Sequence, residues 1–239
     1  MKLSIKQLIT LCAIVLISAE GFSQSAAKQA MQASMFHSDL TLQAQMQKNF
    51  SAIYKANIKG TPYYDKEFNS ANIAPIDKVY FVRYNAALDD MEIIQNKDTL
   101  IMNKNNKDYI IKQNKGNITY KILEYDDSKE DKLGYYVQLT EGTNVALYRK
   151  DRKKFVEVKK AAYGGNLGAT SAEFKKQKSE FYMELNGSGN AIKISKSKKE
   201  FISLFPGKED LVEKFIKQNK IKLNKEDDLI KLINYVNSI

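Results

Sequence analysis

The chain has 239 residues, one cysteine, one histidine and a formal net charge of +10. Because the cysteine, Cys12, lies in an apolar N-terminal stretch, the rest of the chain cannot form a disulfide, a thiolate nucleophile or a cysteine-ligated metal site. Histidine-ligated metal sites and histidine-based triads are excluded unless His37 supplies the imidazole. We therefore expect no cofactor, no metal site and a fold that its apolar core holds together.

The first 23 residues have the pattern of a secretory signal peptide. Two lysines precede an apolar run, 8–18, which is too short to span a bilayer comfortably as a helix, since that takes about 20 residues. Gly21 and Ser23 are the small residues expected just before a cleavage site. Cys12 lies inside the run, whereas a lipoprotein signal carries its cysteine at the cut. We expect an exported protein, periplasmic, outer-membrane-associated or secreted, with no transmembrane segment after signal cleavage.

The basic excess favours acidic partners such as lipid phosphates, acidic glycans or nucleic acid. However, the chain has only three arginines, and its other permanently cationic side chains are lysines. Sites that read phosphate groups usually use the planar fork of arginine. We therefore expect no specific nucleic-acid binding. An anionic glycan or lipid stays open as the partner, as does a purely compositional origin of the charge.

Residues 24–58 are rich in alanine, glutamine and methionine and have the least regular pattern. Met31 and Met35 are four apart, and so are Leu42 and Met46, which is the spacing of a helix face. Serine, threonine and histidine interrupt this spacing. We therefore expect an N-terminal segment that is partly helical or disordered.

From residue 59 to residue 195 the chain has the pattern of a series of short strands. Apolar and polar residues alternate with period two, as from Leu133 to Leu139, and turn residues separate successive runs. Strands joined by such short turns pair antiparallel, because parallel neighbours need a crossover of about a dozen residues. The sequence therefore predicts a curved antiparallel β-meander.

Residues 196–239 change to a helical period. Ser197 can cap a helix that a Pro-Gly pair ends. Two more apolar stripes follow, one around Val212 and one that starts at Asn224. These stripes need a surface to cover, and the open face of the sheet is the expected one. We expect a single α+β domain, 59–239, with its C-terminal helices packed on its sheet.

Three carboxylates, Asp89, Asp90 and Glu92, crowd the stretch VRYNAALDDMEII. A general acid/base pair needs two carboxylates at a fixed separation across a substrate, with one of them desolvated. Here they fall at a predicted hairpin tip, which we expect to be wet, so that nothing separates their pKa values. Aspartate and asparagine suit such a turn. We expect Arg83 and Glu92 to form a cross-strand ion pair worth about 0.2–1 kcal/mol, and we predict no catalytic residues.

Two segments are candidates for contact or modification. The glycine-rich stretch AYGGNLGAT lacks the Lys-Ser/Thr ending of a phosphate loop, but long loops in compact domains are often functional. The predicted partner-binding loop consists of Tyr163, Gly164, Gly165, Asn166, Leu167 and Gly168. The tripeptide DTL resembles an O-glycosylation acceptor of some envelope bacteria, and Thr99 is the candidate residue.

The chain has fourteen tyrosines, several of them in the predicted strands. Aromatic rings on a sheet can stack sugars or bases. They are also ordinary strand residues, half-buried with a wet hydroxyl, and we favour this structural interpretation.

Four stretches resemble a family of exported bacterial envelope proteins. Its pattern is a G-S/T-P-Y…E-F start, an R-Y-N…D-x-M-E hairpin, a G-Y-x-x-x-L-x-E-G strand pair and a closing helix pair that ends in Tyr and Asn. The matching residues here are Gly60, Thr61, Pro62, Tyr63, Glu67, Phe68, Arg83, Tyr84, Asn85, Asp90, Met91, Glu92, Gly134, Tyr135, Leu139, Glu141, Gly142, Tyr235 and Asn237. The resemblance implies a signal peptide, a β-rich body and C-terminal helices, and it implies no activity.

Together these features predict a non-catalytic envelope protein with a binding or structural role. Two alternatives stay open. One is a periplasmic carrier of an acyl-chain ligand or a lipoprotein, which requires an open apolar groove. The other is a hydrolase that works with carboxylates alone, which requires two buried carboxylates about 5–10 Å apart in a cleft.

Overall fold

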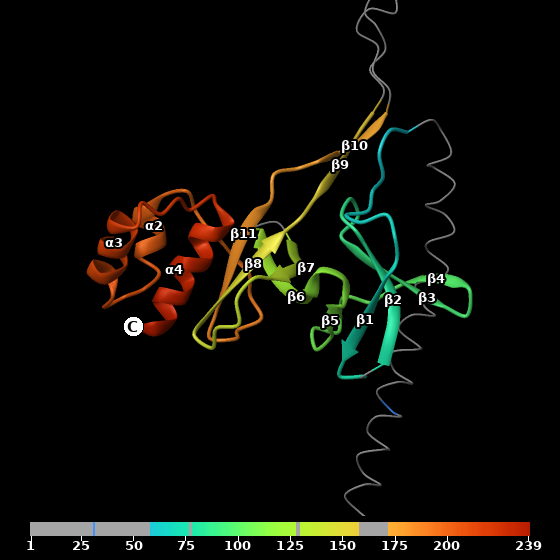
Figure 1. Cartoon of the computed structure of the whole chain (residues 1–239), viewed down its shortest axis with the longest axis horizontal. Coiled ribbons are helices and arrows are strands. Elements are labelled where there is room, and N and C mark those ends of the chain that lie inside the picture. The colour runs from blue at the N-terminus through green and yellow to red at the C-terminus, as the bar shows by residue number, and fades with distance from the viewer. Residues whose placement is uncertain (1–30, 32–57, 77, 128–129, 158–171) are drawn as a thin grey trace, which may run out of the picture.

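The computed structural model of the protein describes residue 31 and residues 58–76, 78–127, 130–157 and 172–239 (Figure 1). The predicted signal peptide, nearly all of the 24–58 segment and the predicted loop 163–168 lie outside these residues. In the described part, an antiparallel sheet is followed by three C-terminal helices, so the predicted α+β class is confirmed. None of the helices among these residues is long and apolar enough to cross a bilayer.

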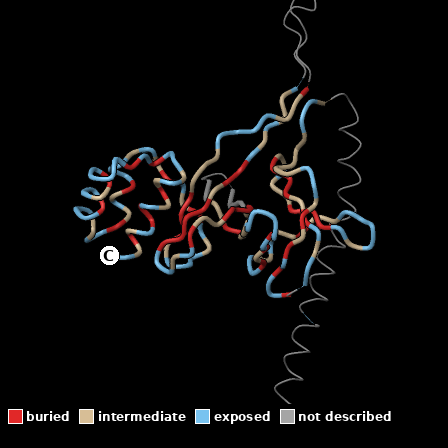
Figure 2. Tube along the Cα trace, viewed as in Figure 1, coloured by how far each residue is buried: buried red, intermediate tan, exposed pale blue. Residues whose placement is uncertain are grey.

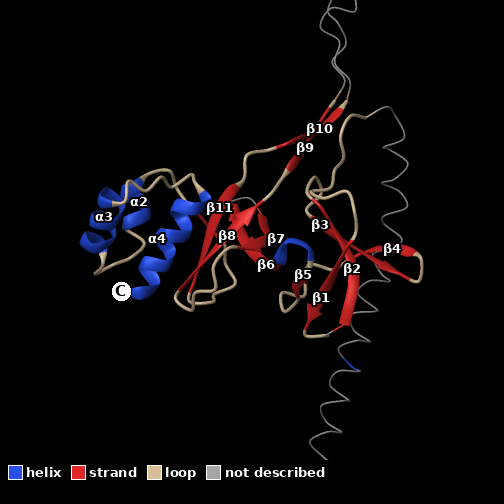
Figure 3. Ribbon diagram, viewed as in Figure 1, coloured by secondary structure: helices blue, strands red, loops and turns tan. Residues whose placement is uncertain are grey.

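Ten strands form one antiparallel sheet built from two meanders (Figure 3). The first meander is β1–β4 and the second is β5–β8 continued by β11 and β12; β1 pairs with β5 and joins them. The strands are β1 (Asn69–Ala74), β2 (Lys78–Asn85), β3 (Asp90–Gln95), β4 (Asp98–Ile101), β5 (Ile110–Gln113), β6 (Ile118–Asp127), β7 (Glu130–Gln138), β8 (Val145–Lys150), β11 (Glu180–Leu185) and β12 (Ile192–Lys193). A short 3₁₀ helix, η1 (Lys115–Asn117), lies between β5 and β6.

The sheet curls into a half-barrel, which brings β3 into contact with β7. Alternation places every second residue of a strand on the concave face. Ile73, Val82 and Ile93 lie there without measurable exposure, in one apolar cluster with residues of β5, β6 and β7. Figure 2 shows the buried positions recurring along these strands. The concave face is therefore filled by the protein's own side chains over most of its area.

The C-terminal helices cover the β8 and β11 end of the same face. They are α2 (Lys198–Ile202), α3 (Glu209–Gln218) and α4 (Glu226–Ser238). Their apolar stripes pack on Val145, Leu147 and Met183, as the sequence predicted. Ser197 caps α2 by accepting a hydrogen bond from the Glu200 N–H at 3.4 Å. The helices leave the β1–β7 part of the face uncovered, because the curl of the sheet already buries it.

A third apolar cluster lies on the opposite face of β6, β7, β8 and β11. Tyr135 belongs to the concave core and the next residue, Tyr136, belongs to this cluster, as the pleat requires. Tyr136 and Tyr182 meet edge to face there, with ring centroids 5.1 Å apart. The turn after β11 covers the cluster, since Asn190 bridges to Glu124 of β6.

Two further strands, β9 (Lys153–Val156) and β10 (Glu173–Lys176), form a two-stranded ribbon that projects from the body between β8 and β11 (Figure 1). We call these eight residues the ribbon. The start of the β-rich region runs beside the outer end of β10 (Figure 1). Lys59 N–H donates to the Ala172 carbonyl, and the Phe174 N–H donates to the Lys59 carbonyl, both at 2.9 Å.

The predicted strand series is confirmed, with two strands that the pattern did not show, β1 and β10. The β1 sequence, NSANIA, is poor in the β-branched and aromatic residues that favour strands. Pairing with β2 on one side and β5 on the other holds it in the sheet. Tertiary context thus overrides a weak local preference.

Candidate functional site

The β2–β3 turn is built as the sequence predicted. The Asn85 side-chain oxygen accepts hydrogen bonds from the N–H groups of Ala87 and Leu88 at 3.2 and 3.1 Å. Asp89 has a φ of 60°, a left-handed conformation that aspartate tolerates better than most residues. The polar residues at this apex do bend the backbone.

The expectation that this apex is wet is wrong. Asp89 reaches the buried lysine at the end of β8, with its Oδ1 2.6 Å from the Lys150 Nζ. The Tyr84 hydroxyl donates to the same oxygen at 2.7 Å, and the Tyr135 N–H donates to it at 3.3 Å. The tip packs against β7 because the half-barrel curl brings the β2–β3 hairpin to that strand. Asp89 is therefore a structural carboxylate.

Lys150 and Asp89 together replace a missing strand partner. The β7–β8 pairing runs only through Val137 and Gln138, so the Tyr135 backbone groups have no strand partner in β8. The Lys150 ammonium donates to the Tyr135 carbonyl at 2.8 Å, while Asp89 accepts from the Tyr135 N–H. Buried backbone groups need such partners. The pair thus closes the sheet edge where β8 turns away into the ribbon.

Burial determines the pKa of Lys150. Its side chain is 1% exposed, and this desolvation lowers the lysine pKa to about 8 although Asp89 opposes the shift. Its ammonium also lies 4.5 Å from the centroid of the Tyr136 ring. Gly134 makes room for this arrangement, because a Cβ there would lie 2.6 Å from the Lys150 Nζ and 2.7 Å from an Asp89 oxygen.

The second carboxylate of the turn has a different partner. Asp90 Oδ1 lies 3.1 Å from the Lys104 Nζ, which also donates to the Asp89 carbonyl at 2.8 Å. Burial raises the pKa of Asp90, and Lys104 counteracts part of this rise. Each aspartate therefore faces a lysine rather than the other carboxylate.

A hollow of about 520 Å³ opens beside this cluster. We call it the basic hollow; its lining residues are Leu88, Asp89, Lys104, Asn105, Tyr125, Leu133, Gly134, Tyr136, Lys150 and Arg152. Three of them are cationic and one is a carboxylate, so the lining carries a net positive charge. Tyr125 and Tyr136 add aromatic rings to the wall.

The ribbon continues the positive charge away from the hollow. Arg152 lines the hollow, and β9 begins at the next residue. In the ribbon register, Lys153 lies opposite Lys176 and Lys154 lies opposite Lys175. Like charges directly opposite each other on neighbouring strands are destabilising. We call the cations of the hollow and the ribbon the basic strip; they are Lys104, Lys150, Arg152, Lys153, Lys154, Lys175 and Lys176.

Among the described residues, carboxylates pair with four of the seven cations of the strip. Lys150 faces Asp89 and Lys104 faces Asp90, as described above. Glu173 pairs with Lys175 at 2.8 Å, and Glu180 lies 3.4 Å from Arg152. Lys153 donates to the Thr61 carbonyl at 2.8 Å, a neutral group. Desolvation, followed by the charge of Lys176, lowers the pKa of Lys153.

The other residues singled out from the sequence have mixed outcomes. The Arg83–Glu92 ion pair is confirmed at 2.7 Å across β2 and β3. It is more buried than a surface pair, and the Arg83 guanidinium also lies 3.5 Å from the centroid of the Tyr63 ring. Thr99 lies exposed on β4, an edge of the sheet, and its glycosylation stays a prediction. The loop 163–168 lies outside the described residues.

Sequence reasoning missed Lys150, the centre of the site. The only signal is that it follows Ala146 and Tyr148 with period two, which places a lysine on an otherwise buried face. Among the described residues, no cluster of histidine, cysteine and carboxylate side chains could hold a metal ion.

Comparison with known proteins adds no relative, because no family model, no curated protein and no solved structure matches the chain. The resemblance of the motifs to envelope proteins therefore stays a prediction. The structure does bring motif residues together in pairs. The Asn237 side chain, for example, makes two hydrogen bonds to the backbone of Val145, and a Cβ at Gly142 would collide with it.

Proposed function

We propose that this protein is a non-catalytic binding protein of the bacterial envelope that holds an acidic polysaccharide along the basic strip. The observation that carries the proposal is the lysine-against-lysine register of the ribbon. Two like-charged pairs in a protein with an excess of basic residues are unfavourable alone and become favourable when an anionic chain lies over them. Export follows from the predicted signal peptide.

The absence of catalysis is part of the proposal. Asp89 pairs with Lys150, and Asp90 pairs with Lys104. Each aspartate therefore faces a lysine and not a second carboxylate. A glycoside hydrolase needs two carboxylates that face each other across the substrate. Within the described residues, the aspartates at the apex instead support the fold.

The shape and chemistry of the strip favour a polysaccharide over a lipid surface. Stable membrane association needs an apolar anchor beside the basic residues. Among the described residues, Leu88 is the one exposed large apolar side chain that lines the basic hollow; others, such as Val79 and Phe81 on β2, lie elsewhere than on the ribbon. The ribbon instead offers one lysine pair on each of its two faces, and the hollow beside it offers two tyrosine rings, which suits a chain of acidic sugars. In the part of the chain that the structure describes, neither the acyl-carrier nor the hydrolase alternative has a comparable supporting feature.

Affinity electrophoresis in gels that contain polygalacturonate tests the proposal, with neutral dextran as the control polymer. We expect the purified protein to be retarded by polygalacturonate alone, and the retardation to vanish at about 0.5 M salt, where charges are screened within a few ångströms. The variant Lys154→Ala, Lys176→Ala removes two strip lysines and should weaken retardation about five- to ten-fold.

The matched control is Lys199→Ala, Lys214→Ala, which removes two exposed lysines from α2 and α3 and changes net charge equally. If both double variants weaken the retardation equally, net charge alone explains the binding, and the proposal is overturned. Binding to phosphatidylglycerol vesicles without any retardation by polygalacturonate would overturn it as well.

A further inference from the structure

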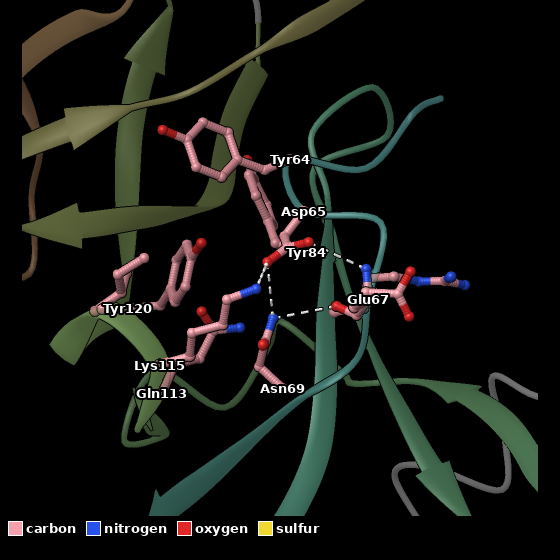
Figure 4. Close-up of a pocket in the computed structure, with 11 residues that line it drawn as sticks. Tyr64, Asp65, Glu67, Asn69, Tyr84, Gln113, Lys115 and Tyr120 are labelled. Atoms are coloured by element: carbon pink, nitrogen blue, oxygen red, sulfur yellow. Dashed lines mark hydrogen bonds and ion pairs between the residues drawn. The ribbon is translucent and has the colours of Figure 1, made fainter. Parts of the chain in front are cut away.

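A second recess lies inside the half-barrel, on the concave face (Figure 4). It has a volume of about 160 Å³, and we call it the tyrosine pocket. The strands β1, β2, β5 and β6 form its floor, and the segment before β1 and the η1 turn form its rim. The residues used below are Tyr64, Asp65, Asn69, Tyr84, Gln113 and Tyr120. Polar side chains interrupt the apolar filling of the concave face here.

Two amides mark the place where the apolar pattern of this face stops. Asn69 continues the inward series of Ala71 and Ile73 on β1, and Gln113 continues the inward position of Ile111 on β5. Gln113 lies opposite Ala71 in the register, so the two amides are diagonal neighbours on the same face. A closed core would place apolar residues at both positions.

The polar groups of this pocket open onto its space. Gln113 and Tyr120 are 6% and 2% exposed and line the pocket. Among the described residues, their side-chain polar atoms do not belong to the fully buried atoms that lack a hydrogen-bond partner, so they face the interior of the pocket. Asn69 donates to Asp65 and to the Glu67 carbonyl. A ligand that fills the pocket must supply hydrogen-bond partners to these groups, because a polar group buried without a partner costs about 1–3 kcal/mol.

The electrostatics of the pocket differ from those of the basic strip. Two carboxylates, Asp65 and Glu67, balance two cations, Arg83 and Lys115, in its lining. Asp65 pairs with Lys115 at 2.8 Å, so neither is left to neutralise a charged ligand. The remaining groups are amides, phenols and rings; Tyr84 and Tyr120 lie with centroids 5.3 Å apart. Burial raises the pKa of Tyr120, so its hydroxyl stays a donor.

From this geometry we infer that the tyrosine pocket binds one neutral sugar ring. Amides and phenols donate to and accept from hydroxyl groups, and the flat tyrosine faces suit the apolar side of a pyranose. The volume corresponds to about five waters at roughly 30 Å³ each, which is the size of one ring rather than a chain. This site is independent of the acidic polysaccharide proposed for the strip.

Saturation-transfer NMR with the purified protein tests this inference, with methyl glucoside and N-acetylglucosamine as neutral probes and glucuronate as the acidic probe. We expect at least one neutral probe to receive saturation, with a dissociation constant in the millimolar range, and glucuronate to bind at least about five-fold more weakly. Tyr120→Phe and Gln113→Met each remove one hydrogen-bonding group and should weaken binding about three- to ten-fold.

Tyr235→Phe is the matched control, because that tyrosine stacks on Phe215 in the helical end and should leave binding unchanged. The spread of amide resonances in each variant checks that it is folded. The inference is overturned if neither neutral probe binds, if glucuronate binds better than both, or if folded Tyr120→Phe and Gln113→Met bind like Tyr235→Phe. Loss of polygalacturonate retardation with intact neutral-sugar binding would overturn the proposed function alone.

Discussion

The basic hollow and the tyrosine pocket are linked by Tyr84, yet they use their polar groups in opposite ways. The Tyr84 ring lines the pocket, and its hydroxyl donates to Asp89, which lines the hollow. In the hollow, Lys150, Asp89 and the Tyr135 backbone satisfy one another. In the pocket, the Gln113 amide and the Tyr120 hydroxyl face the pocket space. Polar groups in the first region therefore stabilise the fold, whereas those in the second are available to a ligand.

The largest effect should come from Lys150→Met, which keeps the length of the side chain and removes its charge. The substitution leaves Asp89 without its cation and the Tyr135 carbonyl without its donor. Breaking one half of a buried pair is strongly destabilising, so we expect the free energy of unfolding to fall by about 3 kcal/mol. Urea unfolding followed by circular dichroism measures it.

The double variant Lys150→Met, Asp89→Asn checks the cause of that loss. It removes the uncompensated charge, so it should recover part of the lost stability relative to Lys150→Met. If Lys150→Met unfolds at the same urea concentration as the native protein, the Lys150–Asp89 pair does not close the sheet edge.

The titration of Lys150 should also make the stability of the protein depend on pH. Its pKa in the folded state, about 8, is lower than the ordinary value of 10.5. Between these two values the unfolded chain binds the proton that the folded chain has released, so the free energy of unfolding rises with pH. We expect a rise of about 2 kcal/mol from pH 7 to pH 10.

Above about pH 10 the direction reverses. Burial raises the pKa of Tyr84 and Tyr135 well above the ordinary 10.0, so unfolded tyrosines release protons that folded ones keep, and stability falls. Urea titrations from pH 7 to 11 should therefore show a maximum near pH 10. In Lys150→Met the rise should become much smaller, because only the lowered pKa of Lys153 still contributes to it, and the fall should stay. A rise as large as that of the native protein would show that Lys150 is not its source.

A smaller loss is expected for Gly134→Ala. The new methyl group would meet the Lys150 Nζ and an Asp89 oxygen, which are the ends of flexible side chains but are held in place by their pair. Moving them weakens the pair, at a cost of about 1–2 kcal/mol. In a Lys150→Ala background the same substitution should cost less, because one of the two obstacles is gone and the other, Asp89, is no longer held by its pair. Additive losses in this double-mutant cycle would mean that Gly134 matters for another reason.

The sequence predicted the elements of this fold better than it predicted the sites. Alternation in β2 and β8, the Ser197 cap and the helical period of the tail are local signals, and they led to the correct strands and helices. The Arg83–Glu92 pair could also be predicted from the sequence, because a short turn fixes which residues of a hairpin lie opposite each other.

Both sites depend on contacts between distant segments. Asp89 and Lys150 are 61 positions apart, and only the curl of the half-barrel brings them together. Asn69 and Gln113 meet because β1 pairs with β5 rather than with its sequence neighbours alone. The β1 sequence gave no strand signal, so the pairing that forms the tyrosine pocket could not be inferred from local pattern.

The smallest and most diagnostic effect should come from Gln113→Met in the absence of sugar. Methionine has a similar length and volume and fits the apolar series of Ala71 and Ile111 on the same face. The amide lines the pocket, so replacing it by an apolar group that packs on Ala71 and Ile111 should raise the free energy of unfolding by at most about 1 kcal/mol. Urea unfolding at pH 7 measures this change.

The sign of the change separates the two regions. Gln138→Met on β7 is the control, because the Gln138 side chain donates to the Thr140 carbonyl at 3.1 Å and its loss should be neutral or destabilising. A gain at Gln113 together with a weaker sugar affinity is expected of a group kept for binding at the expense of stability. A loss at Gln113 as large as that at Gln138 would show that the amide supports the fold, and the contrast between the tyrosine pocket and the basic hollow would then disappear.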